Sequence, residues 1–444
     1  MAKQIKNKKP ITQANKADTK RLRYLIAIPV IAFFIKLITM GNTQGGGWLG
    51  ADGENYFKGV DGLYAEGFFS KADILNYWPA GYPILLWLLV LISVTKFVYL
   101  IGFIQSIFFA YTTYYMTKNI SKTSVAWLAV PASLFITFNP TLSLSTLAVG
   151  YEAPVASCFM MVLGVILASK LNPNNSQYKF ALYAGAWIAL ASLMQPRYLL
   201  AGTVVIVIWG LTFIPRKSAI KFIALAVAVM ALAPALLIAR NVVAIDKRSI
   251  STNLGVTMAI GAGDETKGGY GRTGPDVPCS PKVPGTAVTD NDRVKCVLKW
   301  YLTNPLKTIK LSFYKSQYFW SPWSGPLGEG TMARNPWLKI SPTRDLQNSQ
   351  SGAQLVMGNF GKLISWLWII CQIGFLFYGF MALRKIDQLT KVLADASMAA
   401  VVISWLISIG TIGDHRFRLP TMSLSLLLQV AAMWSIKKKI SKAL

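Results

Sequence analysis

Residues 222–239 read FIALAVAVMALAPALLIA and lie between Lys221 and Arg240. The stretch contains no charged side chain. Its length is close to the roughly 20 apolar residues that an α-helix needs to cross the hydrocarbon core of a bilayer. These residues therefore predict a membrane-spanning helix.

Nine further stretches have the same character, and only the first of them contains a formal charge, Lys36. Together with 222–239, they predict an all-α, multi-pass membrane protein with about ten transmembrane helices. The nine stretches are 24–41, 97–116, 124–147, 153–169, 180–195, 198–214, 363–383, 396–412 and 419–436.

The composition agrees with a membrane protein. Of the 444 residues, 53% are apolar and 14% are charged, whereas soluble domains carry roughly 25% charged residues. The formal net charge is +27. These values exclude a disordered chain, a disulfide scaffold and a conventional soluble enzyme, and leave a membrane protein or an unusually apolar nucleic-acid binder.

The positions of the charges decide between these two classes. Twenty-two cations fall in the N-terminal tail, the even-numbered connections and the C-terminal end, whereas fifteen of the eighteen acids fall in the complementary connections. Short loops rich in Lys and Arg stay in the cytoplasm. We therefore expect both termini inside, in a plasma (inner) membrane, and the basic excess predicts topology and no nucleic-acid partner.

Residues 74–95 also lack charge and are long enough to span. A span here would invert every later loop and place most of the cations outside. Pro79 and Pro83 interrupt the start of the stretch, and Trp78, Tyr82 and Trp87 suit the headgroup level. We therefore predict a helix that lies in the outer interface.

The expected spans divide the chain into four parts: a basic tail at 1–23, an N-terminal transmembrane module at 24–239, a large outer loop at 240–362, and C-terminal helices with a basic tail at 363–444. The module at 24–239 includes an outer loop at 42–96. Helical spacing of apolar residues predicts surface helices over 56–69 and 297–320, the second rich in lysine. Glycines at 45–47 and 261–271 predict flexible loop rather than a phosphate-binding loop.

The cysteines and the single histidine build no zinc site. Cys279 and Cys296 share the large outer loop, where an oxidising compartment would allow a disulfide. The sequence does not fix their separation, so both the paired and the free state stay open. The outer acids could hold a divalent cation, but no spacing requires one.

Charged residues gather at the outer ends of the expected spans. Such charges at the bilayer edge are costly unless they are paired or functional. Snorkelling, helix capping or ion pairing explains any one of them, but these residues come from separate connections and meet on one face. They are the acids Asp52, Glu54 and Glu152 and the cations Lys36, Arg197, Arg240, Arg416 and Arg418.

Carboxylates beside arginines suit chemistry on a lipid that carries a phosphate-linked sugar. Arginine binds phosphate oxygens in bidentate fashion and stabilises charge on a leaving phosphate. A carboxylate can take the proton of an attacking hydroxyl as general base. We therefore expect Asp52, Glu54 and Glu152 to be catalytic and the outer cations to bind substrate.

Short motifs in this order resemble a known enzyme group, the GT-C superfamily of membrane glycosyltransferases, and within it the branch of protein O-mannosyltransferases and the lipid A aminoarabinose transferase. The resemblance covers residues from about 20 to 435. It is carried by Asp52-x-x-x-Tyr56, Trp78-Pro79-x-Gly81-Tyr82-Pro83, Tyr151-Glu152-x-Pro154, Gln195-Pro196-Arg197, Arg240-Asn241, Ser251-Thr252-Asn253-x-Gly255 and Arg416-x-Arg418-Leu419-Pro420.

The resemblance implies an undecaprenyl- or dolichyl-phosphate sugar as donor and an inverting transfer to a hydroxyl of a glycan, lipid or protein on the outer face. It implies Asp52 as general base and Arg416 with Arg418 as holders of the lipid phosphate. It also adds Tyr56, Tyr82 and Asn241 to the expected substrate-binding residues.

Two departures from the family pattern concern the base and the acceptor. Many members have adjacent acids where this chain has Asp52-Gly53-Glu54, so Glu54 is a second candidate for the base. The chain ends soon after the tenth expected span, without the further spans and terminal domain of larger members. The acceptor is therefore left open.

Two other classes compete with a glycosyltransferase. An O-antigen polymerase or ligase also has many spans and a large outer loop with arginines, but does not need the Asp52-x-x-x-Tyr56 loop. A lipid or solute transporter would carry ions or broken helices near the midplane, often in internal repeats. The middles of the expected spans are nearly free of charge, which favours chemistry at one surface.

Overall fold

The computed structural model describes residues 11–41, 48–49, 52–171, 176–263, 267–269, 278–280, 289–320 and 352–443. The basic residues of the tail before residue 11, the glycines at 45–47 and most of the glycine-rich loop after 263 lie outside these ranges.

The described chain is almost entirely helical, which confirms the all-α prediction. Each expected span coincides with a long helix or, at 124–147, with a run of short ones. The long helices are α1 (Ile11–Gly41), α5 (Phe97–Ile120), α8 (Glu152–Leu171), α9 (Gln177–Met194), α10 (Tyr198–Phe213), α11 (Arg216–Ile245), α17 (Gly352–Arg384), α18 (Gln388–Gly410) and α19 (Leu419–Ala443).

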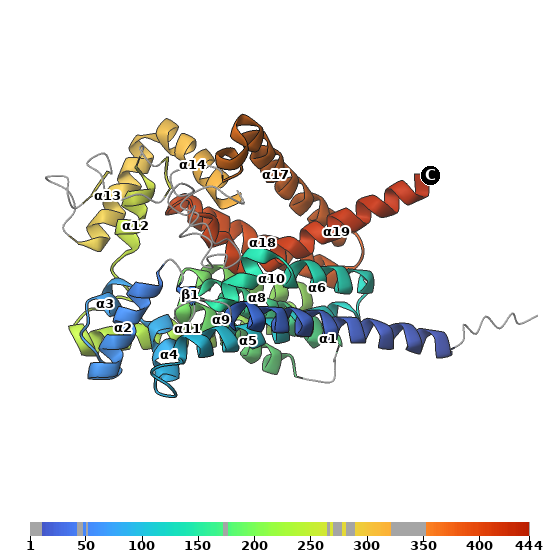
Figure 1. The fold of residues 1–444 in the computed structure, drawn as a ribbon, viewed down its shortest axis with the longest axis horizontal. Coiled ribbons are helices and arrows are strands. Elements are labelled where there is room, and N and C mark those ends of the chain that lie inside the picture. Colours follow the sequence, from blue (N-terminus) through green and yellow to red (C-terminus); the bar gives the residue numbers. More distant parts are fainter. Residues whose placement is uncertain are drawn as a thin grey trace, which may run out of the picture.

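Helix α8 forms the centre of the bundle. It is buried along nearly its whole length and packs against α5, α9 and α19. Helix α1 lies along α5, α11 lies along α9, and α17 pairs with α19. In Figure 1, α1 and α19 run close to the horizontal long axis, and α13 and α14 lie at the upper left, above α2 and α3.

Six described helices are long and apolar enough to cross a membrane, and a seventh span results if one bent pair is counted. The expected number of about ten is therefore not established by length and composition. The bent pair lies at 126–147, where a single span was expected. It turns by 61° between Ala126–Thr137 and Thr141–Leu147. Asn139 caps the second part and Pro140, which has no amide hydrogen, begins it.

Residues 74–95 form two short helices, α3 (Ile74–Tyr77) and α4 (Gly81–Val90). A ten-residue helix is about 15 Å long, half the hydrocarbon thickness of a bilayer. Its length supports the interpretation that this segment does not span.

The outer segments also contain helices. The expected surface helix is α2 (Gly53–Glu66), which buries Tyr56, Val60 and Leu63. Helix α12 (Leu254–Gly261) packs on α13 (Asp290–Thr303). The prediction of a single helix over 297–320 was wrong. Helix α13 ends before Asn304, and a second helix, α14 (Pro305–Trp320), begins at the next residue. A proline disfavours helical backbone in the residue before it, which explains the break.

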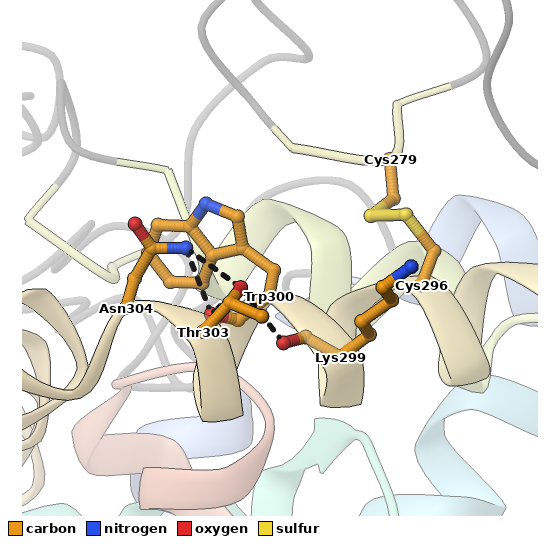
Figure 2. Close-up of a disulfide and its surroundings, with 6 residues drawn as sticks. All are labelled: Cys279, Cys296, Lys299, Trp300, Thr303 and Asn304. Atoms are coloured by element: carbon orange, nitrogen blue, oxygen red, sulfur yellow. Dashed lines mark hydrogen bonds between the residues drawn. A yellow bond between two sulfur atoms is a disulfide. The ribbon is translucent and has the colours of Figure 1, made fainter.

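The outer loop contains the disulfide that the sequence left open. Cys279 is bonded to Cys296 of α13, with the two Cα atoms 6.0 Å apart. Figure 2 shows this bond one turn before Lys299 and Trp300 and two turns before Thr303 on the same helix. The bond ties the chain at residue 279 to α13.

Candidate active site

Two short strands set the position of two acids that are far apart in sequence. Strand β1 (Trp48–Leu49) pairs in parallel with β2 (Ala148–Val149), with Leu49 opposite Val149. Asp52 follows β1 by three residues and Glu152 follows β2 by three residues. Because parallel strands in register carry equivalent positions side by side, the pairing brings both carboxylates to one level.

Arg416 connects these two carboxylates. Its Nε donates to Glu152 Oε1 at 2.7 Å, and its Nη2 donates to Asp52 Oδ2. All three residues are buried. Arg416 belongs to a short 3₁₀ turn, η3 (His415–Arg418), at the start of α19. The guanidinium thus joins the beginnings of α2, α8 and α19 in one ionic cluster.

Asp414 is a third acid in this cluster, and it was not among the predicted site residues. Its Oδ1 accepts a hydrogen bond of 3.0 Å from the backbone amide of Arg416 and so caps η3. Burial raises the pKa of Asp414 to about 6, although the nearby Arg416 charge opposes the shift. The available signal was its position two residues before Arg416, in the same motif.

A cavity of about 90 Å³ lies beside the cluster. Asp52, Tyr56, Arg197, Asp414 and Arg416 are among the residues that line it. Glu152 is absent from the lining and is 1% exposed. Asp52 and Asp414 are therefore the acids of the cluster that face the cavity, whereas Glu152 lies behind Arg416.

Aromatic rings from the first outer segment form one wall. The ring of Tyr56 packs edge-on against Trp78 and Tyr82, with centroids 5.4 and 4.9 Å away. Burial and the nearby Asp52 charge raise the pKa of Tyr56 well above its usual value, so its hydroxyl stays protonated at neutral pH. The Tyr82 hydroxyl accepts a 2.8 Å hydrogen bond from the amide of Gly150, just after β2.

Arg197 is the second arginine at the cavity. Its guanidinium lies 4.0 Å from the centre of the Phe417 ring. Its Nη1 is buried without a hydrogen-bond partner among the described residues. This side chain therefore has a donor left for a ligand.

Arg418 and Lys36 were expected to bind substrate but point elsewhere. Arg418 Nη1 donates to Gln372 Oε1 and to the Trp320 carbonyl, both at 2.9 Å, so it links α19 to α17 and α14. Lys36 Nζ donates to Thr146 Oγ1 at 3.2 Å and lies over the Phe109 ring. Neither residue lines the cavity beside Asp52.

Arg240 and Asn241 hold outer backbone in place. Arg240 is buried and donates to the carbonyls of Phe68, Ser70 and Leu75. Asn241 Nδ2 donates to the carbonyls of Ser249 and Ile250 at 2.8 and 3.1 Å. Their contacts are with the protein itself.

Glu54, the second candidate for the base, lies in the first turn of α2 and is exposed. It is not part of the cavity lining. Of these two acids, Asp52 is the one that is buried and lines the cavity.

No family model matches the sequence. No curated protein matches it either. Solved structures do match: the oligosaccharyltransferase of Archaeoglobus fulgidus in its apo form has a TM-score of 0.50 and 14% identity, over 95% of this chain and 51% of that one.

The fold resembles that of this archaeal oligosaccharyltransferase. The same enzyme tethered through a disulfide to an acceptor peptide with the NVT sequon gives a TM-score of 0.49 and 13% identity, over 94% of this chain and 50% of that one. The archaeal oligosaccharyltransferase AglB from Archaeoglobus fulgidus, in complex with an inhibitory peptide and a dolichol-phosphate, gives 0.48 and 14%, over 95% and 51%. The chain thus spans about half the length of the solved structures that it matches.

The residues at the cluster do not form a recognisable metal site. Among the described residues, no three His, Cys, Asp or Glu side chains converge as metal ligands. The cation between Asp52 and Glu152 is the guanidinium of Arg416.

Proposed function

We propose that this protein is an inverting glycosyltransferase that moves a sugar from a polyprenyl-phosphate donor to an acceptor hydroxyl at the outer face of the membrane. The observation that carries the proposal is the buried Asp52–Arg416–Glu152 cluster, with only Asp52 and Arg416 open to a cavity. The GT-C-like fold supports it. The dolichol-phosphate in the archaeal AglB structure suggests the class of donor.

Asp52 is the proposed general base. Its Oδ2 accepts from Arg416, and its Oδ1 has no hydrogen-bond partner among the described residues. The ion pair with Arg416 fixes the direction of the carboxylate. The acceptor O–H gives its proton to Asp52 while the oxygen attacks the anomeric carbon. The bond from that carbon to the phosphate oxygen breaks, and the configuration inverts.

The leaving polyprenyl phosphate needs positive charge, and Arg197 is the proposed residue that supplies it. Its unpartnered Nη1 lies at the cavity, and guanidinium donors match phosphate oxygens. Arg416, which also lines the cavity, adds positive charge. Arg418 donates hydrogen bonds to Gln372 and to the Trp320 carbonyl. Its proposed contribution is indirect, because these bonds hold η3 against α17 and α14.

The proposed site belongs on the outer face of a plasma (inner) membrane, with both termini inside. The loop charges support this orientation. The disulfide Cys279–Cys296 supports it as well, because disulfides persist in oxidising compartments.

The test uses full-length purified protein and radiolabelled undecaprenyl- and dolichyl-phosphate sugars, with release of the sugar as the readout. Asp52→Asn should lower turnover about 100-fold or more, the usual contribution of a general base, with donor binding retained. Asp61→Asn is the matched control, since Asp61 is an exposed acid on the same helix α2. Full turnover in Asp52→Asn, or no donor consumed by the wild type, would overturn the proposal.

A further inference from the structure

A second, larger cavity opens beside the proposed active site. Its volume is about 1050 Å³, above the roughly 300–1,000 Å³ that is usual for small-molecule sites. Tyr77, Pro79 and Arg197 line both this cavity and the smaller one at Asp52. A ligand in the larger cavity would therefore border the proposed base.

The lining of this larger cavity is strongly basic. Four cations, Arg197, Lys247, Arg248 and Arg293, line it together with one acid, Asp290. None of the four forms a salt bridge within the described part of the chain. Arg293 Nε is also buried without a hydrogen-bond partner among those residues.

The single acid is already occupied by the protein. Asp290 Oδ1 accepts from the amides of Gly255 and Val256 at 2.8 and 3.3 Å, and so caps the start of α12. The backbones of α12 and α13 come close together here, as a Cβ atom built on Gly255 would lie only 2.3 Å from the Asp290 carbonyl oxygen. The Asp290 carboxylate thus joins α12 to α13, and the cations are left to attract an anion.

The remaining polar lining suits a ligand rich in hydroxyl groups. It includes short side chains that can donate and accept hydrogen bonds, among them Ser249, Ser251, Thr252, Asn253, Thr257 and Asn291. The cavity is also larger than one sugar ring requires. A saccharide that carries negative charge matches both the size and the chemistry of this wall.

We propose that this cavity binds the acceptor and that the acceptor is an acidic saccharide, with phosphate or carboxylate groups held by Lys247, Arg248 and Arg293. The inference rests on the proposed function, because it assigns the acceptor of that reaction. The acidic groups lie at the basic wall, and a hydroxyl of the same saccharide reaches Asp52 through the shared opening at Arg197.

The test is binding to the full-length protein by titration calorimetry, without any donor. Tetragalacturonate and mannose 6-phosphate are the charged probes, and maltotetraose and mannose are their neutral counterparts. The charged probes should bind and the neutral ones should not. Lys247→Ala with Arg248→Ala, and separately Arg293→Gln, should each weaken binding of the charged probes about tenfold, equivalent to roughly 1.4 kcal/mol.

The matched control is Lys299→Ala with Lys310→Ala, which removes two exposed cations from α13 and α14, outside the cavity lining. It should leave binding unchanged. Equal binding of neutral and charged saccharides, unchanged binding in both cavity variants, or tighter binding of tetraglutamate than of tetragalacturonate would overturn the inference.

The two proposals fail separately. Asp52→Asn should still bind tetragalacturonate, because Asp52 is not in the lining of the larger cavity. If the charged saccharide binds as expected while donor turnover survives Asp52→Asn, the proposed mechanism falls and the saccharide site stands. If Asp52→Asn loses turnover and no charged saccharide binds, the proposed mechanism stands and the saccharide site falls.

Discussion

At the scale of single residues, the feature that matters most is an arginine shared by two carboxylates. Arg416 spans Glu152 and Asp52 with different nitrogens of one guanidinium. Removing one partner of a buried ionic pair typically costs about 3–5 kcal/mol, because a charge is left uncompensated. Glu152 therefore orients Arg416, and through it Asp52, without touching the cavity.

Glu152→Gln should separate this orienting role from that of the base. The Gln amide oxygen can still accept a hydrogen bond from Arg416 but carries no charge, so the interaction that orients Arg416 becomes weaker. We expect turnover of the polyprenyl-phosphate donor to fall about tenfold or more, with a lower melting temperature, and to recover partly in Glu152→Asp. Turnover kinetics and thermal unfolding of the purified variants provide the measurement.

Glu54→Gln is the control for this comparison, since Glu54 is exposed on α2. It should match the wild type in both turnover and melting temperature. A severe loss in Glu54→Gln, with normal Glu152→Gln, would move the base role to Glu54 and contradict the assignment made here.

At the scale of elements, one lysine fixes the outer helix α14 to the site. Lys315 is buried, and its Nζ donates to the carbonyls of Ile409 and Thr411 at 2.9 and 3.0 Å and to the Tyr301 hydroxyl at 3.0 Å. These carbonyls lie at the end of α18, where they have no partner within the helix. A Cβ on Gly413 would come within 2.7 Å of the Lys315 Cα atom, so α14 lies close against the loop before Arg416.

This contact predicts a pH dependence of stability. Burial lowers the pKa of Lys315 to about 7 from its usual 10.5. Between these values the unfolded chain binds the proton and the folded chain does not, so stability rises with pH in this window. We expect the wild-type melting temperature to rise from pH 7 to pH 9 more steeply than that of Lys315→Met.

Lys310→Met is the control for the pH experiment, since Lys310 is exposed on the same helix. Its pH profile should follow that of the wild type. Parallel profiles for the wild type and Lys315→Met would show that Lys315 is not the group that titrates.

The sequence predicted most helices because charge-free stretches are long and their ends are charged. It failed where proline acts locally: Pro140 divides an expected span and Pro305 divides an expected surface helix. It also placed Arg416 and Arg418 together as phosphate ligands. In a 3₁₀ turn their side chains diverge, one to the acids and one to Gln372, and nothing in a one-letter pattern specifies that divergence.

At the scale of the whole molecule, the sequence pointed to the residues of the site but could not assemble it. Asp52, Glu152 and Arg416 were all selected as outer charges at span ends. Their contact depends on two strands of two residues each, at 48–49 and 148–149, and on the turn at 415–418. Such short pairing has no periodicity to detect, so it becomes visible only in three dimensions.

The orientation in the membrane can be tested through the disulfide. In a Cys371→Ser variant, intact cells would be treated with a membrane-impermeant phosphine and then with a bulky impermeant maleimide. Because Cys158 is buried, Cys279 and Cys296 are the thiols that become reactive. We expect labelling of intact cells only after reduction. Labelling that requires cell lysis would place this loop, and the site beside it, in the cytoplasm.

The ionic cluster also has a consequence for how the protein is made. Asp52 and Glu152 precede Arg416 by 364 and 264 residues. During synthesis both acids are therefore present long before their counter-charge emerges from the ribosome. A buried carboxylate without a partner is costly, so the centre cannot close on a nascent chain that stops short of α19. The proposed active site can therefore form only after the turn at 415–418 has been synthesised.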